Sequence, residues 1–573
     1  MKPSSTWLKI SRSNPDPMST ALFRIWCLFG ALAALLGACW AEATGYMKVA
    51  DPTVPTYSNN FYNYTFAHYE PPALLATALF FLALCLCGKF INKMGEGTRW
   101  LLASRRLPLL VSLSVFVIAC MGRFGAHQNF DLCIDEYLNE FEVGILQQQH
   151  LVAELPSEWI SDQKAMRVGY QIYHGDAVKG YWASGFLPGF AFLDYLFDSL
   201  GIGWALGAAL AAVSLLFLAA LVRRAFPDDD RFAANIAVLL LACSPQFLVM
   251  AFTKFAWPAH LCGTLLWVWL FTHPRKTLFL LTPIVGAFLI GLHQPQVHLL
   301  VAAPFLLRLV YTFRWKAVLW FGAWYLAGIA GWYKILVLLR PTLSGPGGEL
   351  ANMGFPFLLS FFVTICHTIT FYAWTTPALP LLAGLALVTW KRQPPLVHDS
   401  LVAAAITFFF YMSFPHVQGH GWGARYMHPA YGLLALAAAG GAVTLSREFH
   451  KPASAAKMVL LSLLFSLVIQ MPWRIQEVIT MVRPLSRAWT YIATRPVDFV
   501  ILETSEFWYA RDLIRNDPWL KRKPFVFDAE YLTANQKSEL ARRGSVMTVG
   551  ANEVRSCGVI LPDPSKKPSP SDR

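Results

Sequence analysis

Recurrent apolar runs of about 20 residues constrain this chain most, because a helix of that length spans the hydrocarbon core of a bilayer. Of the 573 residues, 56% are hydrophobic and 14% are charged, and the mean hydropathy is +0.44. A water-soluble protein of this size does not need so much apolar surface. The sequence therefore predicts an all-α polytopic membrane protein embedded in the lipid bilayer.

The positive charges indicate the topology rather than a nucleic-acid partner. The formal net charge is +13, and Lys and Arg occur mostly in short connections between apolar runs, as is typical of cytoplasmic loops. Inside and outside connections alternate if about 13 helices span. We expect them near 21–41, 72–90, 107–122, 203–222, 232–251, 257–272, 277–292, 299–313, 317–338, 376–390, 401–415, 429–445 and 457–472. The stretch Phe355–Tyr372 breaks this parity, and we interpret it as an interfacial or re-entrant helix.

Four regions follow from this topology. They are an N-terminal helix pair with an external loop (1–106), a transmembrane core (107–473) with an external acidic loop (123–184), an external α/β module (474–560) and a disordered tail (561–573). In the module we expect strands at 498–503, 525–528 and 546–549, and helices at 507–516 and 533–543. No glycine-rich phosphate loop follows its first strand, so nucleotide binding there is not expected.

The acidic loop contains the most informative motif, Asp131-Leu-Cys-Ile-Asp135-Glu136-Tyr137, which closely follows the apolar run Leu107–Met121. The whole loop has nine Asp or Glu against four Lys or Arg. Carboxylates at a membrane face cost desolvation energy, so they usually indicate chemistry or a bound cation rather than packing. The alternative is a solvated acidic face on an interfacial helix.

The residues after this motif have helical periodicity from Asp135, the predicted N-cap, to about Gln149. Asp135, Asn139 and Glu142 would share one face. An opposite apolar stripe is expected from Leu138, Phe141 and Ile145.

Asp135-Glu136-Tyr137, in the first large external loop after an early helix, resembles the Asp-Glu-aromatic motif of the GT-C class of membrane glycosyltransferases. Protein O-mannosyltransferases and lipid A aminoarabinose transferases belong to this class. Gly180–Gly189 is similar to the segment with which bacterial members re-enter the membrane. The motifs cover residues 120–190 and the layout about 105–560, whereas the two leading helices depart from the simplest family layout.

The resemblance implies a donor sugar on a polyprenyl phosphate, a hydroxyl acceptor in the cell envelope, and transfer with inversion at the outer, periplasmic face of the inner membrane. The acceptor hydroxyl needs a base. Asp135 is the first candidate for this catalytic role, Asp131 is the second, and Glu136 lies beside them. The leaving phosphate needs cationic side chains or a metal.

Cationic and aromatic residues near outer helix ends are the candidate ligands of the donor. The segment His416–Pro429 contains three glycines, which let the backbone approach a ligand, and Arg425 can hold a phosphate with two hydrogen bonds. The complete candidate set is Arg425, His420, His293, His298, Lys254, Trp422 and Tyr426. For the glycine-rich segment the alternative is an aromatic-belt loop with a snorkelling Arg.

His293 and His298 could instead belong to a plain polar turn, and as metal ligands they lack a third partner in the sequence. We expect no cofactor and leave a divalent metal open. A polysaccharide ligase or polymerase that uses the same carrier lipid, and a transporter or flippase, remain alternative functions. A transporter predicts paired repeats and ionisable residues near the bilayer midplane, and the sequence shows neither pattern.

Overall fold

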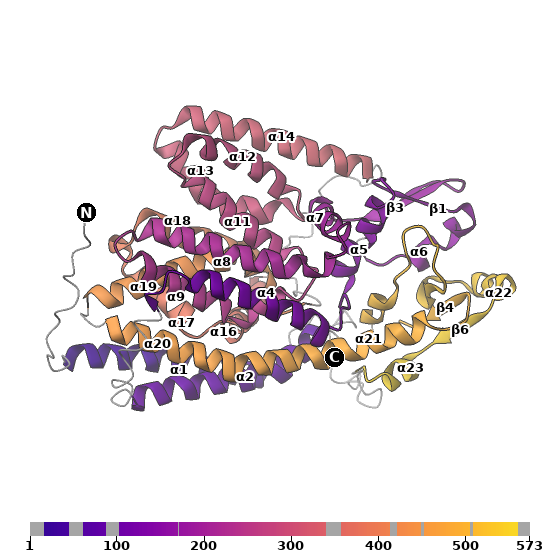
Figure 1. Ribbon diagram of the computed structural model, residues 1–573. Helices are drawn as coiled ribbons and strands as arrows, with labels where there is room; N and C mark the ends of the chain where they lie inside the picture. Colours follow the sequence, from indigo (N-terminus) through magenta and orange to yellow (C-terminus); the bar gives the residue numbers. More distant parts are fainter. Residues whose placement is uncertain are drawn as a thin grey trace.

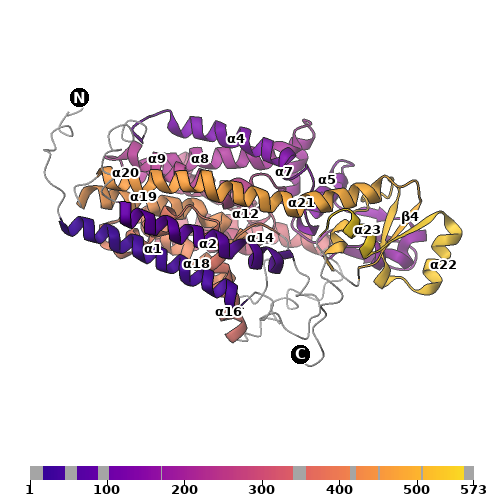
Figure 2. The ribbon, with the colours of Figure 1, turned by 90° about the horizontal axis from the view of Figure 1, so that it is seen from below.

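A bundle of apolar helices forms most of the structure, and two small sheets lie at one end of it (Figures 1 and 2). The computed structural model describes residues 17–44, 61–87, 102–169, 171–339, 357–412, 421–448, 452–504 and 508–559. The helices of the bundle are α1 (Pro17–Thr44), α2 (Phe61–Cys87), α4 (Leu107–Gly125), α8 (Leu206–Ala225), α9 (Asp230–Ala242), α10 (Pro245–Met250), α11 (Trp257–Phe271), α12 (Lys276–Ile290), α13 (Pro295–Tyr311), α14 (Trp315–Leu339), α16 (Phe357–Ala373), α17 (Ala378–Val388), α18 (Pro395–Met412), α19 (Tyr431–Glu448), α20 (Pro452–Phe465) and α21 (Met471–Ala493).

The predicted helical, polytopic membrane architecture is confirmed. Within the described ranges, seven helices are long and apolar enough to cross a membrane, or eight if one bent pair counts as a single span. A helix lies at every predicted position, but several, such as α12 and α13, are shorter than a full span. The count of thirteen spans therefore stays a prediction.

The N-terminal helices α1 and α2 pack side by side because one face of α1 carries small residues. Cys27, Ala31, Ala34, Ala38 and Ala41 are buried, whereas the large apolar side chains between them, such as Leu36 with 61% exposure, point outward. Small residues let two helix backbones approach closely, and outward Leu and Phe side chains suit contact with lipid tails.

The bent pair consists of α16 and α17, which meet at 114° across a break of a few residues. α16 covers the stretch that was predicted as interfacial or re-entrant, and a bend of this size fits a re-entrant loop as well as a broken span. Trp374, Thr375 and Thr376 form the corner between the two helices and are fully buried. The corner therefore lies inside the bundle, where it can touch other elements.

The acidic loop is more structured than the sequence predicted. It contains helix α5 (Ile134–Leu146) and an antiparallel sheet of β1 (Ala153–Leu155), β2 (Gln171–Gly175) and β3 (Gly180–Ser184) in the order β1-β3-β2. Helix α7 (Gly189–Asp198) then leads back to the bundle. The predicted helix is confirmed, whereas the sheet was missed because its strands are short and lack clear alternation.

The C-terminal module follows the long helix α21 and lies at the same end of the bundle as the acidic loop (Figures 1 and 2). Its parallel sheet has the order β5-β4-β6, from β4 (Phe499–Leu502), β5 (Phe525–Asp528) and β6 (Val546–Val549). The three strands and helix α22 (Ala534–Arg543) were predicted correctly. The helix expected at 507–516 is a short 3-10 helix, η10 (Trp508–Leu513), within the described residues.

Candidate functional site

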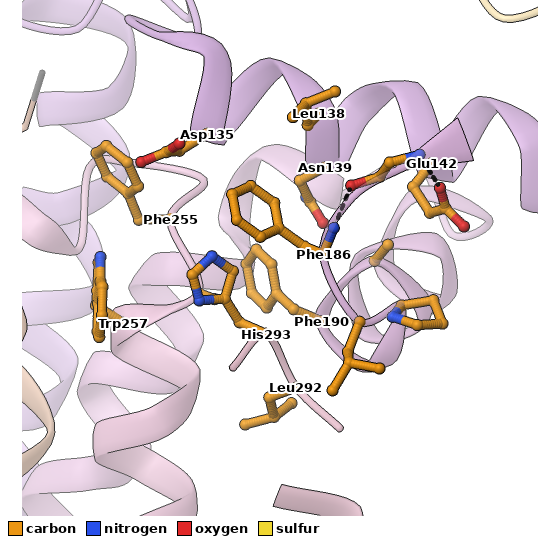
Figure 3. Close-up of a pocket in the computed structure, with 15 residues that line it drawn as sticks. Asp135, Leu138, Asn139, Glu142, Phe186, Phe190, Phe255, Trp257, Leu292 and His293 are labelled. Carbon is orange, nitrogen blue, oxygen red and sulfur yellow. Dashed lines mark hydrogen bonds between the residues drawn. The ribbon is translucent and has the colours of Figure 1, made fainter. Parts of the chain in front are cut away.

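A pocket lies where α5 faces the β3–α7 turn and two loops of the bundle (Figure 3). Its volume is about 410 Å³, part of which is open to solvent. The lining residues are Asp135, Leu138, Asn139, Glu142, Ser184, Phe186, Leu187, Pro188, Phe190, Ala191, Phe255, Ala256, Trp257, Leu292 and His293. Polar groups thus come mainly from α5, and aromatic side chains from the other walls.

The predicted polar face of α5 forms one wall of the pocket. Asp135, Asn139 and Glu142 follow one another along this wall, and Leu138 of the predicted apolar stripe also reaches it (Figure 3). Glu142 is 1% exposed, and its Oε2 atom accepts a hydrogen bond of 3.0 Å from the backbone N–H of Ser184. Burial raises the pKa of the Glu142 carboxyl to about 8, so this group is mostly neutral at pH 7.

The beginning of α5 differs from the prediction. Cys133, not Asp135, is the N-cap, and Asp135 lies in the first turn. The backbone N–H of Ile134 donates to Asp512 Oδ1 of the C-terminal module at 2.9 Å. A tertiary contact, rather than a capping side chain next to it in the chain, therefore satisfies a free N–H group of the first turn of α5.

Asp135 forms an ion pair with Arg425, with 2.8 Å between Asp135 Oδ2 and Arg425 Nη1. The two side chains are 22% and 6% exposed. Arg425 begins the 3-10 helix η8 (Arg425–Ala430), directly before α19. The predicted base and the predicted phosphate ligand thus meet at the edge of one pocket, although they lie 290 residues apart in the chain.

Aromatic rings surround this ion pair. The Arg425 guanidinium carbon lies 5.2 Å from the ring centre of Phe255 and 5.3 Å from that of Tyr426. Tyr426 stacks on Tyr411 with ring centres 4.9 Å apart, and it makes an edge-to-face contact with Trp257. These contacts hold the guanidinium in place beside the pocket.

Asp131 and Glu136 are buried behind Asp135, and neither lines the pocket. Asp131 forms an ion pair of 2.7 Å with Arg123. Burial raises the pKa of Asp131, but the charges of Arg123, Lys254 and Arg515 and a hydrogen bond with Glu140 together hold the pKa well below its usual range. Glu136 accepts the backbone N–H groups of Leu132 and Lys254. In this structure both carboxylates hold the loop in position.

Lys254, a predicted phosphate ligand, forms an ion pair within the protein. Its Nζ atom lies 3.5 Å from Asp194 Oδ2 of α7. Asp194 Oδ2 also accepts a hydrogen bond of 2.6 Å from Asn139 Nδ2. Lys254 therefore links α7 to the loop before α11, and its charge is balanced by a buried carboxylate.

The two histidines that were predicted as a pair are separated. His293 lines the pocket, with its ring 4.2 Å from that of Phe186, and burial lowers its pKa to about 4. His298 lies inside α13, where its Nε2 atom is 2.7 Å from the Tyr325 hydroxyl. The prediction of a shared external turn is wrong for His298, because α13 begins at Pro295 and turns this side chain into the bundle.

The remaining candidates are Trp422 and His420. Trp422 is fully buried, its Nε1 atom lies 3.4 Å from His127 Nε2, and it does not line the pocket. Its burial follows from packing against the corner between α16 and α17. His420 lies outside the described residues. Among the side chains that the structure describes, no group of three His, Cys, Asp or Glu is placed to hold a metal ion.

The sequence analysis missed the segment 512–519 of the C-terminal module, which binds α5 and its surroundings. Arg515 donates to the backbone oxygen of Asp131. The Tyr137 hydroxyl donates to the backbone oxygen of Asn516 at 2.5 Å. Trp519 Nε1 donates to the backbone oxygen of Gly144 at 3.0 Å. No local pattern connects residue 512 with residue 134, so a single sequence holds no signal for these contacts.

No protein-family model matches the chain, and no curated protein matches it. Among solved structures, ArnT from Cupriavidus metallidurans bound to undecaprenyl phosphate is 12% identical, with a TM-score of 0.44 over 73% of this chain and 86% of that chain. The oligosaccharyltransferase from Archaeoglobus fulgidus in the apo form is 15% identical, with a TM-score of 0.40 over 76% of this chain and 65% of that chain. Both belong to the GT-C class, but at these TM-scores no conclusion about this chain rests on the likeness.

Proposed function

We propose that this protein is a membrane glycosyltransferase that moves a sugar from a polyprenyl-phosphate carrier to a hydroxyl of a cell-envelope acceptor on the outer face of the membrane. The observation that carries the proposal is the contact between Asp135 and Arg425 at the edge of the pocket. A carboxylate and a guanidinium are the two groups that glycosyl transfer from a phosphate requires, one for the attacking hydroxyl and one for the leaving anion.

The chemistry assigns a separate role to each member of the pair. Asp135 takes the proton of the acceptor hydroxyl while that oxygen bonds to the anomeric carbon. The bond from the anomeric carbon to the phosphate oxygen breaks, and its electron pair stays on the phosphate. Arg425 stabilises this anion through a planar set of N–H donors. In-line attack inverts the configuration at the anomeric carbon.

The pocket beside the pair has the properties of a sugar-binding site. Phe186, Phe190 and Trp257 offer apolar ring surfaces, and Asn139 and His293 offer hydrogen-bonding groups (Figure 3). His293 is neutral above pH 5 because its pKa is about 4, so it would contact sugar hydroxyls rather than neutralise phosphate. Such a mixture of apolar walls and a few placed polar groups is typical of small-molecule sites.

The proposal is tested by carrier-lipid binding. A lipid extract of the purified protein should contain polyprenyl phosphate or its sugar-linked form, and a polyprenyl phosphate added in detergent should bind. Arg425→Ala should weaken this binding, and Arg425→Lys should weaken it less because the charge remains while the planar donors are lost.

The matched control is Arg308→Ala, which breaks an Arg–Asp pair outside the pocket lining. In that pair, Arg308 Nη2 lies 2.6 Å from Asp399 Oδ1. If wild type and Arg425→Ala bind the lipid equally, Arg425 does not hold the carrier. If wild type binds no polyprenyl phosphate and transfers no sugar, the proposed function is wrong.

The outer location of the site is tested by thiol labelling. Cys557 lies at the end of α23 (Ala551–Ser556) in the C-terminal module and is partly exposed. A membrane-impermeant maleimide should label it in intact spheroplasts. Cys133 is buried and is therefore a poor reporter. Labelling of Cys557 only after permeabilisation would reverse the proposed orientation.

A further inference from the structure

A buried ion-pair cluster joins the N-terminal helix pair to the rest of the bundle. Arg474 of α21 is fully buried, and its Nη2 atom lies 2.5 Å from Glu70 Oε2 of α2. Its Nη1 atom lies 2.7 Å from Glu477 Oε2, one turn further along α21. Buried charges persist only when they are well paired, so this cluster specifies how α2 and α21 fit together.

The cluster extends to the corner between α16 and α17 through Trp374. The Trp374 Nε1 atom donates a hydrogen bond of 3.0 Å to Glu70 Oε1. The Arg474 guanidinium carbon lies 4.5 Å from the centre of the Trp374 ring. Glu70 therefore bonds Arg474 with one carboxylate oxygen and Trp374 with the other, and these three residues are called the Glu70 cluster below.

Trp374 in turn contacts the loop that carries Arg425. The backbone N–H of Gln246 donates to the Trp374 backbone oxygen at 3.0 Å, and Gln246 Nε2 donates to the Trp422 backbone oxygen at 3.1 Å. Gly423 has φ of +54°, and a Cβ atom there would lie 1.9 Å from Gln246 Oε1 and 2.8 Å from the Trp374 ring. The loop thus packs directly on Trp374, with no space for even a methyl group.

The distance from this contact to the proposed phosphate ligand is two residues of chain. Gly423 packs on Trp374, and Arg425 pairs with Asp135. Cores at this packing density do not deform smoothly, because a displaced ring must move its neighbours. A shift of Trp374 would therefore be transmitted to the backbone before Arg425.

We infer that the Glu70 cluster positions Arg425 against Asp135, so that the N-terminal helix pair is a working part of the donor-phosphate site. This inference rests on the proposed function of Arg425. Glu70, Arg474 and Trp374 are positioning residues, since none of them lines the pocket. The inferred role explains why α2 contributes the charged residue Glu70 to the interior of the bundle.

The test uses Glu70→Gln and Trp374→Phe in the full chain. The first keeps the shape of the side chain and removes its charge, and the second keeps a ring and removes the Nε1 donor. Each should lower kcat/KM for the sugar donor by about tenfold to 10²-fold, as expected for small misplacements of a catalytic group, and leave the KM for the acceptor unchanged. Thr77→Val is the control on α2, because the Thr77 hydroxyl donates to the Ala73 backbone oxygen within its own helix.

If Glu70 acts by positioning Arg425, the effect of Glu70→Gln on activity must depend on the presence of Arg425. A general structural role of Glu70 would give the same loss with or without Arg425. In an Arg425→Ala background, Glu70→Gln should cause little further loss, since the group that it positions is gone. A full additional loss in that background overturns the inference. If Glu70→Gln does not accumulate in the membrane, Trp374→Phe decides by the same comparison.

A second readout does not depend on the proposed function. In the double variant Asp135→Cys, Arg425→Cys, a short bifunctional thiol reagent should join the two side chains, with each single substitution as background control. Adding Glu70→Gln should lower the yield, and adding Thr77→Val should not. An unchanged yield overturns the inference even if the protein proves to be a transferase, whereas a lowered yield supports it even if the substrate is different.

Discussion

Asp135 and Arg425 are held by two different kinds of interaction, although they form one ion pair. On the side of Asp135, α5 donates hydrogen bonds to the C-terminal module, to Asp512 and Asn516. Arg515 of the module donates to the backbone oxygen of Asp131, just before α5. On the side of Arg425, the loop is packed inside the bundle, with Gly423 against Gln246 and Trp374. Asp135 is therefore held at the interface between α5 and the C-terminal module, whereas Arg425 is held in the close-packed interior of the helix bundle.

This difference in packing predicts how α5 and the loop of Arg425 respond to substitutions. A single hydrogen bond contributes about 0.5–1.5 kcal/mol, and the loss of one at a surface between two parts can be relieved by a small shift. An added methyl group in a close-packed interior has no such relief. We therefore expect the loop of Arg425 to be the rigid side of the site and α5 to be the adjustable side.

The largest expected effect breaks the pair itself. Asp135→Asn keeps the size of the side chain but cannot accept the proton, so turnover should fall by about 10²–10⁴-fold. Thermal stability should fall as well, because the change removes the Asp135 charge beside the buried Arg425, so turnover is expressed per amount of folded protein. Turnover is measured with donor lipid and acceptor at saturation.

Asp131→Asn is the companion variant, since Asp131 was the second candidate for the base. It should act mainly on stability, because it leaves Arg123 buried without its ionic partner. Full transfer activity in both Asn variants would falsify the base mechanism.

The rigid side is tested by Gly423→Ala. Its positive φ and the 1.9 Å approach to Gln246 leave no room for Cβ, so the loop must shift and turnover should fall by about 10²-fold. Gly384→Ala is the matched control in α17, where nothing lies within 4 Å of the new Cβ. Equal activities of the two variants would show that the loop is not rigid.

The adjustable side is tested by Asp512→Ala. This change removes the acceptor for the Ile134 N–H and should lower the free energy of unfolding by about 1 kcal/mol, as the loss of a helix cap does. Turnover should fall less than in Gly423→Ala. Glu530→Gln is the control in the same module, because Glu530 pairs with Arg511. A larger loss in Asp512→Ala than in Gly423→Ala would reverse the comparison.

The smallest expected effect concerns Glu142, at the other end of α5. Its pKa is raised from 4.5 to about 8 in the folded protein, so the folded state binds the proton more tightly than the unfolded state. The resulting stability is present below pH 4.5 and is lost as the pH rises through about 8. Wild type should therefore be less stable to heat at pH 8 than at pH 5, and Glu142→Gln should show a smaller difference. An identical pH dependence in both proteins would exclude this role.

The elements of the fold were largely predictable because they depend on local patterns. Apolar runs identified the helices, and the strands at 499–502, 525–528 and 546–549 were found from short buried runs between turn residues. The polar face of α5 followed from helical periodicity alone. The sheet β1-β3-β2 was missed, because three-residue and five-residue strands carry little periodic signal.

The chain itself determined which residue types were available for the site, and Asp135 and Arg425 were both recognised from their charge and their position at helix ends. Only the tertiary structure decided that these two side chains meet, that Asp131, Glu136 and Lys254 are engaged elsewhere, and that Trp422 and His298 are buried. The reason is physical. Backbone periodicity depends on neighbours within a few residues, whereas the partner of a charged side chain depends on how segments up to 404 residues apart, such as Glu70 and Arg474, are packed together.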